Sequence, residues 1–516
     1  MLCRGAEERP IRTLCAALFA LLAQPADLRW IHDGMPTPQA LALVQVLQSA
    51  ALDALDPDDY DASLWDERLA RLGSRGGQRA FDKALTAAAE RYVSDRKTGR
   101  VHPRLGGARL EKPAPGDVRA FVERLARADD LAAVLREADK PFPPYPRMLE
   151  AYRHYLSLAR LDPGGGVPGV RRIVEPGERW SGVPRVARLL ALTGDLCTGR
   201  TGDTDEYDGA LADAVRRFQQ RHGLVADGRI GRRTVQALNV PFARRVVQLE
   251  LAIERLRWLP QAFPASPIVV NIPEYRLRMR GPGETLEMNV VVGRAFRHRT
   301  PVFASAVQSV LFRPFWNVPR SIERDELIAE LESDPAKMEA QGFEAVDARG
   351  IAARGADVPE RLRSGELRLR QRPGPRNALG LVKFELPNRF GVYLHGTPAP
   401  AVFARPRRDL SHGCIRVEDA AALAARLLGW THEQVAQAME GEETVRVELE
   451  RPVPVLVFYS TAVAREDGTV HFYDDVYRLD AALERALDRS RAQRLPPSAV
   501  LLPQHPDVSS TALLLQ

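Results

Sequence analysis

The chain has very little cysteine. Its 516 residues include only four, Cys3, Cys15, Cys197 and Cys414, and no two of them stand at the CxxC spacing of a metal or redox pair. We therefore expect no disulfide framework, and the count alone leaves both redox compartments open. Each cysteine has to be judged from its neighbours.

The chain also lacks a long hydrophobic run. No stretch reaches the roughly 18 to 20 apolar residues that span a bilayer, so we expect the mature chain to be soluble. The nearest candidate, Thr13–Ala23, follows three arginines and gives residues 1–25 the outline of a secretory signal. Two glutamates interrupt the basic region, however, and no clear cleavage site follows. An ordinary buried helix, or a start that has lost the true signal, is the alternative.

Neither sign of charge dominates the sequence. The 73 Lys and Arg residues are spread along the chain with 67 Asp and Glu, for a net charge of +6. Without a basic tail or a nucleic-acid-reading motif, nucleic acid is not an expected partner. The 45% hydrophobic content is typical of a globular protein, and the length predicts roughly two to four domains.

The first part of the chain is predicted to be helical and the second β-rich. A Thr37-Pro38 start signal precedes the apolar-periodic run Ala40–Leu55, and the acidic run Asp56–Asp61 ends that helix. Glycine and proline are concentrated between residues 162 and 184, which indicates a domain linker. From about Pro267 the pattern changes to β-type runs. These runs are Ile268–Ile272, Leu286–Val292, Val307–Phe312 and Gly391–Leu394.

Residues 184–241 form a predicted three-helix module. Leu211, Val215 and Phe218 share one helix face, Gly223 stops that helix, and a turn at Asp227-Gly228 leads to a further helix. The segments 214–224 and 227–231 resemble the peptidoglycan-binding domain of many cell-wall enzymes. The usual proline is replaced by Arg232, so a helical spacer without a ligand is the alternative.

Cys414 stands in a run that suits a nucleophile. It follows Ser411, His412 and Gly413, and fifteen residues separate Ser411 from His395. A free cysteine titrates near about 8.5, so a neighbouring imidazole such as that of His395 is the usual means of activating it. Gly413 allows a close turn, from which the amides of Gly413 and Cys414 could meet an oxyanion.

The segments 393–398 and 411–417 resemble, at the expected spacing, the active-site signature of the L,D-transpeptidase family. The likeness extends from about residue 180 to 480. Its further parts are 291–293, 299–303, 313–322, 370–380 and 467–473. Gly396 departs from the pattern, because relatives often carry Asp there.

The resemblance implies an α+β multidomain protein of the large periplasmic subgroup. We expect a helical scaffold domain (1–165), a peptidoglycan-binding-like domain with its linker (166–243), a β-rich catalytic domain (244–452) and a C-terminal strand extension and tail (453–516). The charged, helix-prone segment Glu323–Ser364 fits a helical lid inserted in the catalytic domain. The implied location is the periplasm of a Gram-negative bacterium.

The implied activity is a cysteine acyl transfer on peptidoglycan stem peptides, with no cofactor and no metal. Cys414 would attack the third residue of a tetrapeptide stem and expel D-alanine, and an amine of a second stem would resolve the thioester into a 3-3 cross-link. The resemblance implies three sets of residues. They are the catalytic pair Cys414 and His395, the site-shaping Ser411, His412, Gly413 and Tyr393, and the substrate-binding Trp316, Asn317 and Arg416.

Several alternatives stay open. Water in place of the amine would make the same site an L,D-carboxypeptidase or endopeptidase. A non-catalytic wall-binding protein is disfavoured because His395 and Cys414 are both present, and a zinc site is disfavoured by the ligand spacing. Trp316 could be a plain core aromatic. Six arginines on and after the lid, between Arg361 and Arg376 and opposed only by Glu366, form either a solvated face or a surface that attracts anionic stems.

Overall fold

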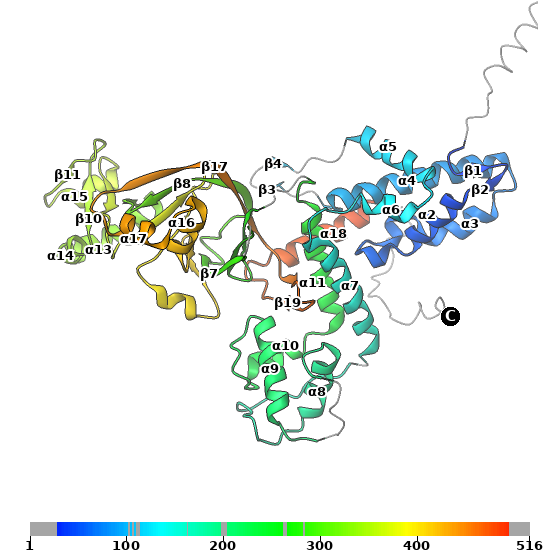
Figure 1. Cartoon of the computed structure of the whole chain (residues 1–516), viewed down its shortest axis with the longest axis horizontal. Helices are drawn as coiled ribbons and strands as arrows, with labels where there is room; N and C mark the ends of the chain where they lie inside the picture. Colours follow the sequence, from blue (N-terminus) through cyan, green and yellow to red (C-terminus); the bar gives the residue numbers. More distant parts are fainter. Residues whose placement is uncertain are drawn as a thin grey trace, which may run out of the picture.

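The computed structural model describes residues 28–494, apart from 102–103, 106–107, 110–113, 163, 198–203, 262–265 and 282–283. One end of the molecule is helical and the other is β-rich, so the predicted α+β multidomain architecture is confirmed (Figure 1). The expected signal segment, with Cys3 and Cys15, lies outside the described residues. Within them, no helix has the length and apolar character needed to cross a membrane.

The N-terminal part is a helical bundle with its own core. Its first helix begins where predicted, since the Thr37 hydroxyl accepts a hydrogen bond from the Ala40 amide at 3.1 Å. It ends at Gln48, earlier than expected, and three short 3₁₀ helices follow. The elements are β1 (Ile31–His32), β2 (Met35–Pro36), α2 (Pro38–Gln48), η1 (Ala50–Asp53), η2 (Pro57–Tyr60), η3 (Ala62–Leu64), α3 (Trp65–Ala70), α4 (Arg75–Thr98), β3 (Arg104–Leu105), β4 (Ala108–Arg109), α5 (Pro115–Ala126) and α6 (Leu131–Arg136).

The predicted three-helix module is present as α8 (Val183–Leu192), α9 (Gly209–Arg221) and α10 (Arg232–Leu238). Its predicted face is buried, and Gly223 has a φ of +63° just after α9. The module shares one hydrophobic core with Leu456 of β17 (Val445–Phe458) and with residues of four further elements. These are α7 (Pro144–Leu161), α11 (Phe242–Arg257), β18 (Ala462–Ala464) and β19 (Val470–Phe472).

Two expected boundaries differ from the elements that the structure shows. Helix α11 packs along α7, so the part of the expected catalytic domain that begins at residue 244 belongs to the helical half. The expected break at 452–453 falls inside a 14-residue strand, β17 (Val445–Phe458). The C-terminal extension is not only strand, because it ends in α18 (Leu479–Arg494).

The β-rich domain is built on a nine-stranded sheet in the order β15-β7-β16-β14-β13-β8-β17-β5-β6. A further pairing of β6 with β7 closes eight of these strands into a barrel. The strands are β5 (Ile268–Asn271), β6 (Arg276–Met279), β7 (Leu286–Gly293), β8 (Phe303–Phe312), β13 (Val382–Glu385), β14 (Leu394–His395), β15 (Asp409–Ser411), β16 (Ile415–Val417) and β17. Helices α16 (Ala420–Leu428) and α17 (His432–Glu440) follow β16.

The insertion between β8 and β13 is a lid of mixed structure, so the prediction of a helical lid was partly wrong. It has a four-stranded sheet and a separate core. Its elements are β9 (Trp316–Asn317), α12 (Arg320–Ile322), the π-helical η4 (Glu323–Leu327), α13 (Ile328–Ser333), α14 (Pro335–Ala340), β10 (Phe343–Val346), β11 (Ala352–Ala353), α15 (Val358–Ser364) and β12 (Arg368–Gln371).

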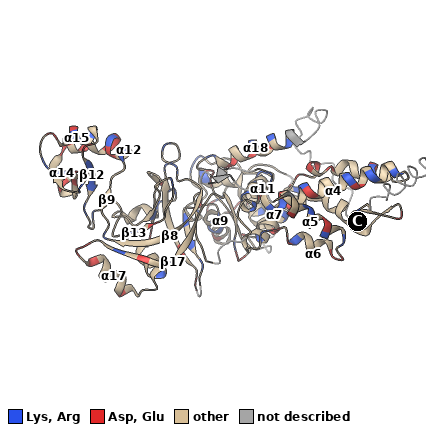
Figure 2. Ribbon diagram, turned by 90° about the horizontal axis from the view of Figure 1, so that it is seen from above, with Lys and Arg blue, Asp and Glu red and all other residues tan. Residues whose placement is uncertain are grey.

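The lid arginines are not opposed by Glu366 alone. Arg363 pairs with Glu332 at 2.5 Å and Arg370 with Glu344 at 2.6 Å, and Arg361 also lies 3.4 Å from Asp357. Blue and red residues accordingly lie together on this part of the molecule (Figure 2). With Arg368 at 4.0 Å from Glu323, four of the six arginines lie within 4.0 Å of a carboxylate, so the charge of this surface is neutralised in part.

Candidate active site

The two segments singled out in the sequence are neighbouring strands of the barrel. Strand β14 runs parallel to β16, with Leu394 opposite Ile415 and His395 opposite Arg416. Leu394 and Ile415 are fully buried in the barrel core. Because side chains alternate along a strand, His395, Arg416, Cys414 and Tyr393 share the other face. The structure thus brings the predicted nucleophile and base to one surface.

His395 is held as a neutral imidazole. It is only 5% exposed, and its Nδ1 is buried without a hydrogen-bond partner. Burial, with a smaller effect of the Arg416 charge, lowers the pKa of His395 to about 3. The resting ring is therefore ready to accept a proton, but it is a weak base until substrate changes its surroundings.

Cys414 is held as a thiol in the resting site. Its Sγ makes a weak contact with the Gly391 carbonyl at 3.9 Å. Burial raises the pKa of the thiol, and the contacts with Tyr393 and the charges of Lys383 and Arg416 oppose that rise. These groups are placed to stabilise the thiolate once it forms.

Tyr393 connects the nucleophile to the lid. Burial first, and then the neighbouring Cys414, raise the pKa of its phenol, and the same hydroxyl contacts Trp316. Its ring lies edge-on to His395 at 5.6 Å, and the ammonium of Lys383 stands 4.7 Å from the ring centre. Trp316 also packs against Phe343 in the lid, so it lines the site and belongs to the lid core at once.

Ser411 shapes the loop before the nucleophile. Its hydroxyl donates to the Cys414 carbonyl at 2.6 Å and accepts from the Gly413 amide at 3.1 Å. The Gly413 amide is therefore already engaged, contrary to the expectation that it meets an oxyanion. Gly413 has a φ of +115°, and its carbonyl accepts from the Thr300 hydroxyl at 2.8 Å.

His412 points toward the lid, away from a role as base. Its Nε2 lies 2.6 Å from a carboxylate oxygen of Glu326 in η4, and its ring lies 4.7 Å from that of His298. Burial and the nearby His412 lower the pKa of His298. A lid carboxylate thus touches the residue two positions before Cys414.

The two other predicted substrate residues differ in position. Arg416 is half-buried on the site face with an unpartnered Nε, and burial lowers its pKa. Asn317 is exposed and pairs with Arg370 in the lid sheet. Over the described part of the chain, no group of three or more His, Cys, Asp or Glu side chains is arranged to hold a metal.

Three residues of this site were not predicted. Lys383 lies opposite His395 on β13, Thr300 fixes the Gly413 carbonyl, and Glu326 contacts His412. Only Lys383 has a local signal, because it is the polar residue between the buried Val382 and Phe384.

Three family models match separate parts of the chain. Residues 266–455 match the L,D-transpeptidase catalytic domain, residues 23–151 match the Scaffold domain, and residues 187–238 match the "Putative peptidoglycan binding domain". All three agree with the predicted order of domains.

Individual relatives add to this. A Haemophilus influenzae protein named "Putative L,D-transpeptidase" is 31% identical over 274 residues, which cover 51% of this chain and 55% of that protein. The chain therefore spans about half the length of the curated relative that it matches. The L,D-transpeptidase structure (residues 123–326) from Xylanimonas cellulosilytica aligns over 58% of this chain and 100% of its own. Its identity is 13% and its TM-score 0.16, too low to bear on the fold.

Proposed function

We propose that this chain, in which residues 266–455 match the L,D-transpeptidase catalytic domain, forms 3-3 cross-links between peptidoglycan stems. The observation that supports this most is the shared face of β14 and β16, where Tyr393, His395, Cys414 and Arg416 meet. We propose that it works outside the cytoplasmic membrane, in the periplasm, where its substrate lies.

In the first half-reaction the Cys414 thiol loses its proton to His395 and the sulfur attacks the carbonyl carbon of the third stem residue. The oxyanion that forms is met by the Cys414 amide and the Tyr393 hydroxyl, and the charges of Lys383 and Arg416 favour the anionic state. Collapse breaks the peptide bond. His395 returns the proton to the amine, so D-alanine leaves and a thioester remains.

In the second half-reaction the side-chain amine of another stem attacks the thioester. The new amide bond joins two diamino residues, and the Cys414 sulfur leaves and regains a proton. The lid can limit water at this stage, because Trp316 and Glu326 bring it against the site. A dry site favours the amine over hydrolysis.

Adduct formation tests the nucleophile. Incubation with a carbapenem should add one drug mass to the protein, and Cys414→Ala should show none by mass spectrometry. Cys197→Ala is the matched control, because Cys197 is also a free thiol but is exposed and far along the chain. An adduct on Cys414→Ala would exclude the assignment.

Product analysis tests the reaction. Tetrapeptide muropeptides with abundant acceptor stems should yield dimers joined through two diamino residues, detected by tandem mass spectrometry. If the only product is free tripeptide, the enzyme is a hydrolase and the transferase proposal is wrong.

A further inference from the structure

A hollow of about 270 Å³ lies where the three-helix module and the barrel meet the segment that follows β17, which we call the C-terminal segment. The module lines it with Gly223 and Arg233, and the barrel lines it with Tyr275 and Arg276. Arg408 also lines it, and this residue lies just before the segment 411–414 that carries Cys414, which we call the catalytic loop. A molecule bound there would touch the module and the catalytic domain at once.

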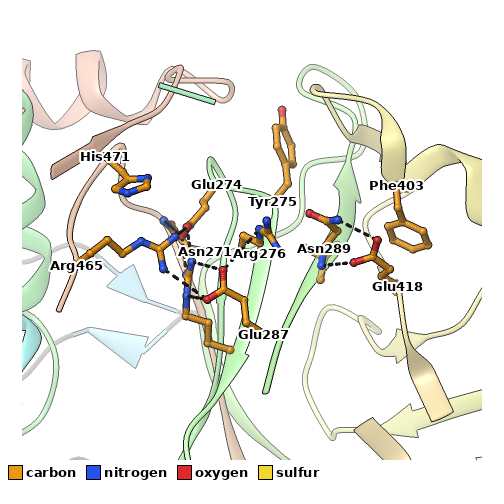
Figure 3. A network of polar contacts seen from close by, with 12 residues as sticks. Asn271, Glu274, Tyr275, Arg276, Glu287, Asn289, Phe403, Glu418, Arg465 and His471 are labelled. Carbon is orange, nitrogen blue, oxygen red and sulfur yellow. Dashed lines mark hydrogen bonds and ion pairs between the residues drawn. The ribbon is translucent and has the colours of Figure 1, made fainter. Parts of the chain in front are cut away.

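One wall of the hollow is fixed by a satisfied polar network (Figure 3). The buried Glu274 carboxylate accepts hydrogen bonds from Arg278 at 2.7 Å, Arg465 at 2.5 Å and Tyr473 at 2.9 Å. These partners outweigh burial and lower the pKa of Glu274 to about 2. Because Arg465 and Tyr473 come from the C-terminal segment, the network holds that segment rigidly against the barrel.

The other wall carries a buried positive charge without a carboxylate in contact. Arg408 is only 8% exposed. All its hydrogen-bond acceptors are neutral oxygens. They are the carbonyls of Tyr275, Val290, Phe403 and Arg405 and the side-chain oxygen of Asn289. Burial first, and then the nearby Arg276, lower the pKa of Arg408, and Tyr275 and the more distant Glu418 oppose this only in part. An anion in the hollow would relieve that repulsion.

Two arginines at the rim are held only by long ion pairs, which a bound anion could replace. Arg276 lies 3.7 Å from Glu287, too far for a hydrogen bond, and Arg233 holds Asp474 at 3.4 Å with both side chains more than half exposed. Arg407, in contrast, donates two hydrogen bonds to the Asp409 carboxylate, at 2.6 and 3.0 Å. The available positive charge therefore comes from the module and the barrel together.

The hollow is connected to the nucleophile by one strand. β7 carries Asn289 at the hollow and, four residues on, Gly293, which pairs with Ser411 of the catalytic loop. At about 3.3 Å per residue this is a separation of roughly 13 Å along the strand. A polymeric ligand that binds in the hollow with one repeating unit could thus place a neighbouring unit at Cys414.

We propose that this hollow binds carboxylate groups of a peptidoglycan strand while a stem of the same strand occupies the Cys414 site. Arg276 of the barrel and Arg233 of the module bind the carboxylate, and the buried positive charge of Arg408 attracts it. This inference rests on the proposed function, and it assigns the strand a path from the binding module to the nucleophile.

The test compares rim variants with matched arginines elsewhere. Arg276→Ala and Arg233→Ala should each weaken binding to soluble tetrapeptide muropeptide oligomers by about five- to tenfold. Arg451→Ala on the exposed part of β17 and Arg179→Ala before the module are the controls, because neither residue lines the hollow. Rim variants that bind as tightly as these controls would overturn the proposal.

A second arm uses the unchanged protein. Muropeptide oligomers whose carboxylates have been amidated should bind about tenfold or more weakly than the acids, and equal affinity would overturn the proposal. Carbapenem adduct formation is followed in parallel. If the adduct forms normally but amidation of the carboxylates does not change the affinity, this inference is wrong and the proposed function stands. If amidation weakens binding but no adduct forms, the proposed function is wrong and this inference stands.

Discussion

At the scale of single residues, the charge of Lys383 favours ionisation of Cys414, beside the larger effects of burial and of Tyr393. The Lys383 charge lowers the pKa of a thiol that burial raises, and Lys383 lies opposite His395 in the sheet. Lys383→Met should therefore raise the pKa of Cys414 further. Because only the thiolate reacts, we expect the pH profile of carbapenem adduct formation to move upward by up to about one pH unit, with up to tenfold slower reaction near neutrality.

Arg446→Met is the matched control for this shift. Arg446 and Lys383 both pair with Glu385, at 2.9 and 3.0 Å, but Arg446 does not contribute to the Cys414 pKa. Profiles measured from about pH 6 to about pH 10 should therefore separate the two variants. If Lys383→Met follows the wild-type profile, its charge does not act on the thiol.

The sequence identified some of these residues and not others. Cys414, His395 and Tyr393 were all predicted from the resemblance of their segments to the family signature, and alternation along the strand places Tyr393 and His395 on one face. Thr300 and Glu326 were missed because they come from segments more than eighty residues before Cys414 and touch only its loop. Such contacts depend on the closed barrel and the docked lid, which no local pattern encodes.

At the scale of elements, η4 connects the lid to the catalytic loop. Glu323 is buried and accepts from the Leu369 amide at 2.7 Å, so the start of η4 is anchored in the lid sheet. One turn later Glu326 holds His412. Glu326→Ala should loosen the lid. We expect faster hydrogen exchange in residues 320–371 and a few-fold larger share of free tripeptide among the products, because water gains access to the thioester.

Glu330→Ala serves as the control for that change. Glu330 lies on the next helix of the lid and pairs with Lys337 at 2.7 Å, without touching the catalytic loop. A matched effect of the two substitutions would mean that the His412 contact does not hold the lid. Glu326→Gln, which can still hydrogen-bond His412, should lie between wild type and Glu326→Ala.

The elements differ in how well the sequence predicts them. The predicted runs over 268–272, 286–292 and 307–312 all fall on barrel strands, because consecutive β-branched and aliphatic residues fill its core. The run predicted at Gly391–Leu394 covers only the start of β14. The lid strands β10 and β11 were missed because they are short and flanked by charged residues, so their pairing depends on the lid core.

At the scale of the whole molecule, the three-helix module packs into a core that it shares with other elements and is not an independent domain. Its Arg221 pairs with Asp195 inside the module and also reaches the Tyr155 hydroxyl of α7 and the Val470 carbonyl of β19. The sequence predicted the module but could not predict this packing, since its partners are distant along the chain. Deleting residues 184–241 would therefore expose the core of α7 and β19, and substitutions at the rim test its binding more cleanly.

The seam between the module and the C-terminal segment should weaken in acid because of His222. Its ring is stacked between Phe218 at 3.9 Å and Phe472 at 5.7 Å. Burial first, and then the charges of Arg221 and Arg245, lower the pKa of His222 well below its ordinary 6.5, and His471 nearby acts in the same direction. Below about pH 6.5 the unfolded chain therefore protonates His222 while the folded protein keeps it neutral. The free energy of unfolding is constant with respect to His222 above about pH 6.5 and decreases below it.

At pH 5 this cost reaches at most about 2 kcal/mol, because 1.5 pH units below 6.5 correspond to that free energy. His222→Phe keeps the stack and cannot take up the proton, so its stability should fall less than that of the wild type between about pH 7 and about pH 5. Hydrogen exchange of the α9 and β19 amides, corrected for the intrinsic effect of pH, reports on the seam itself. If those amides lose the same protection in both proteins, the acid sensitivity comes from other groups, and His222 does not couple the module to the rest of the molecule.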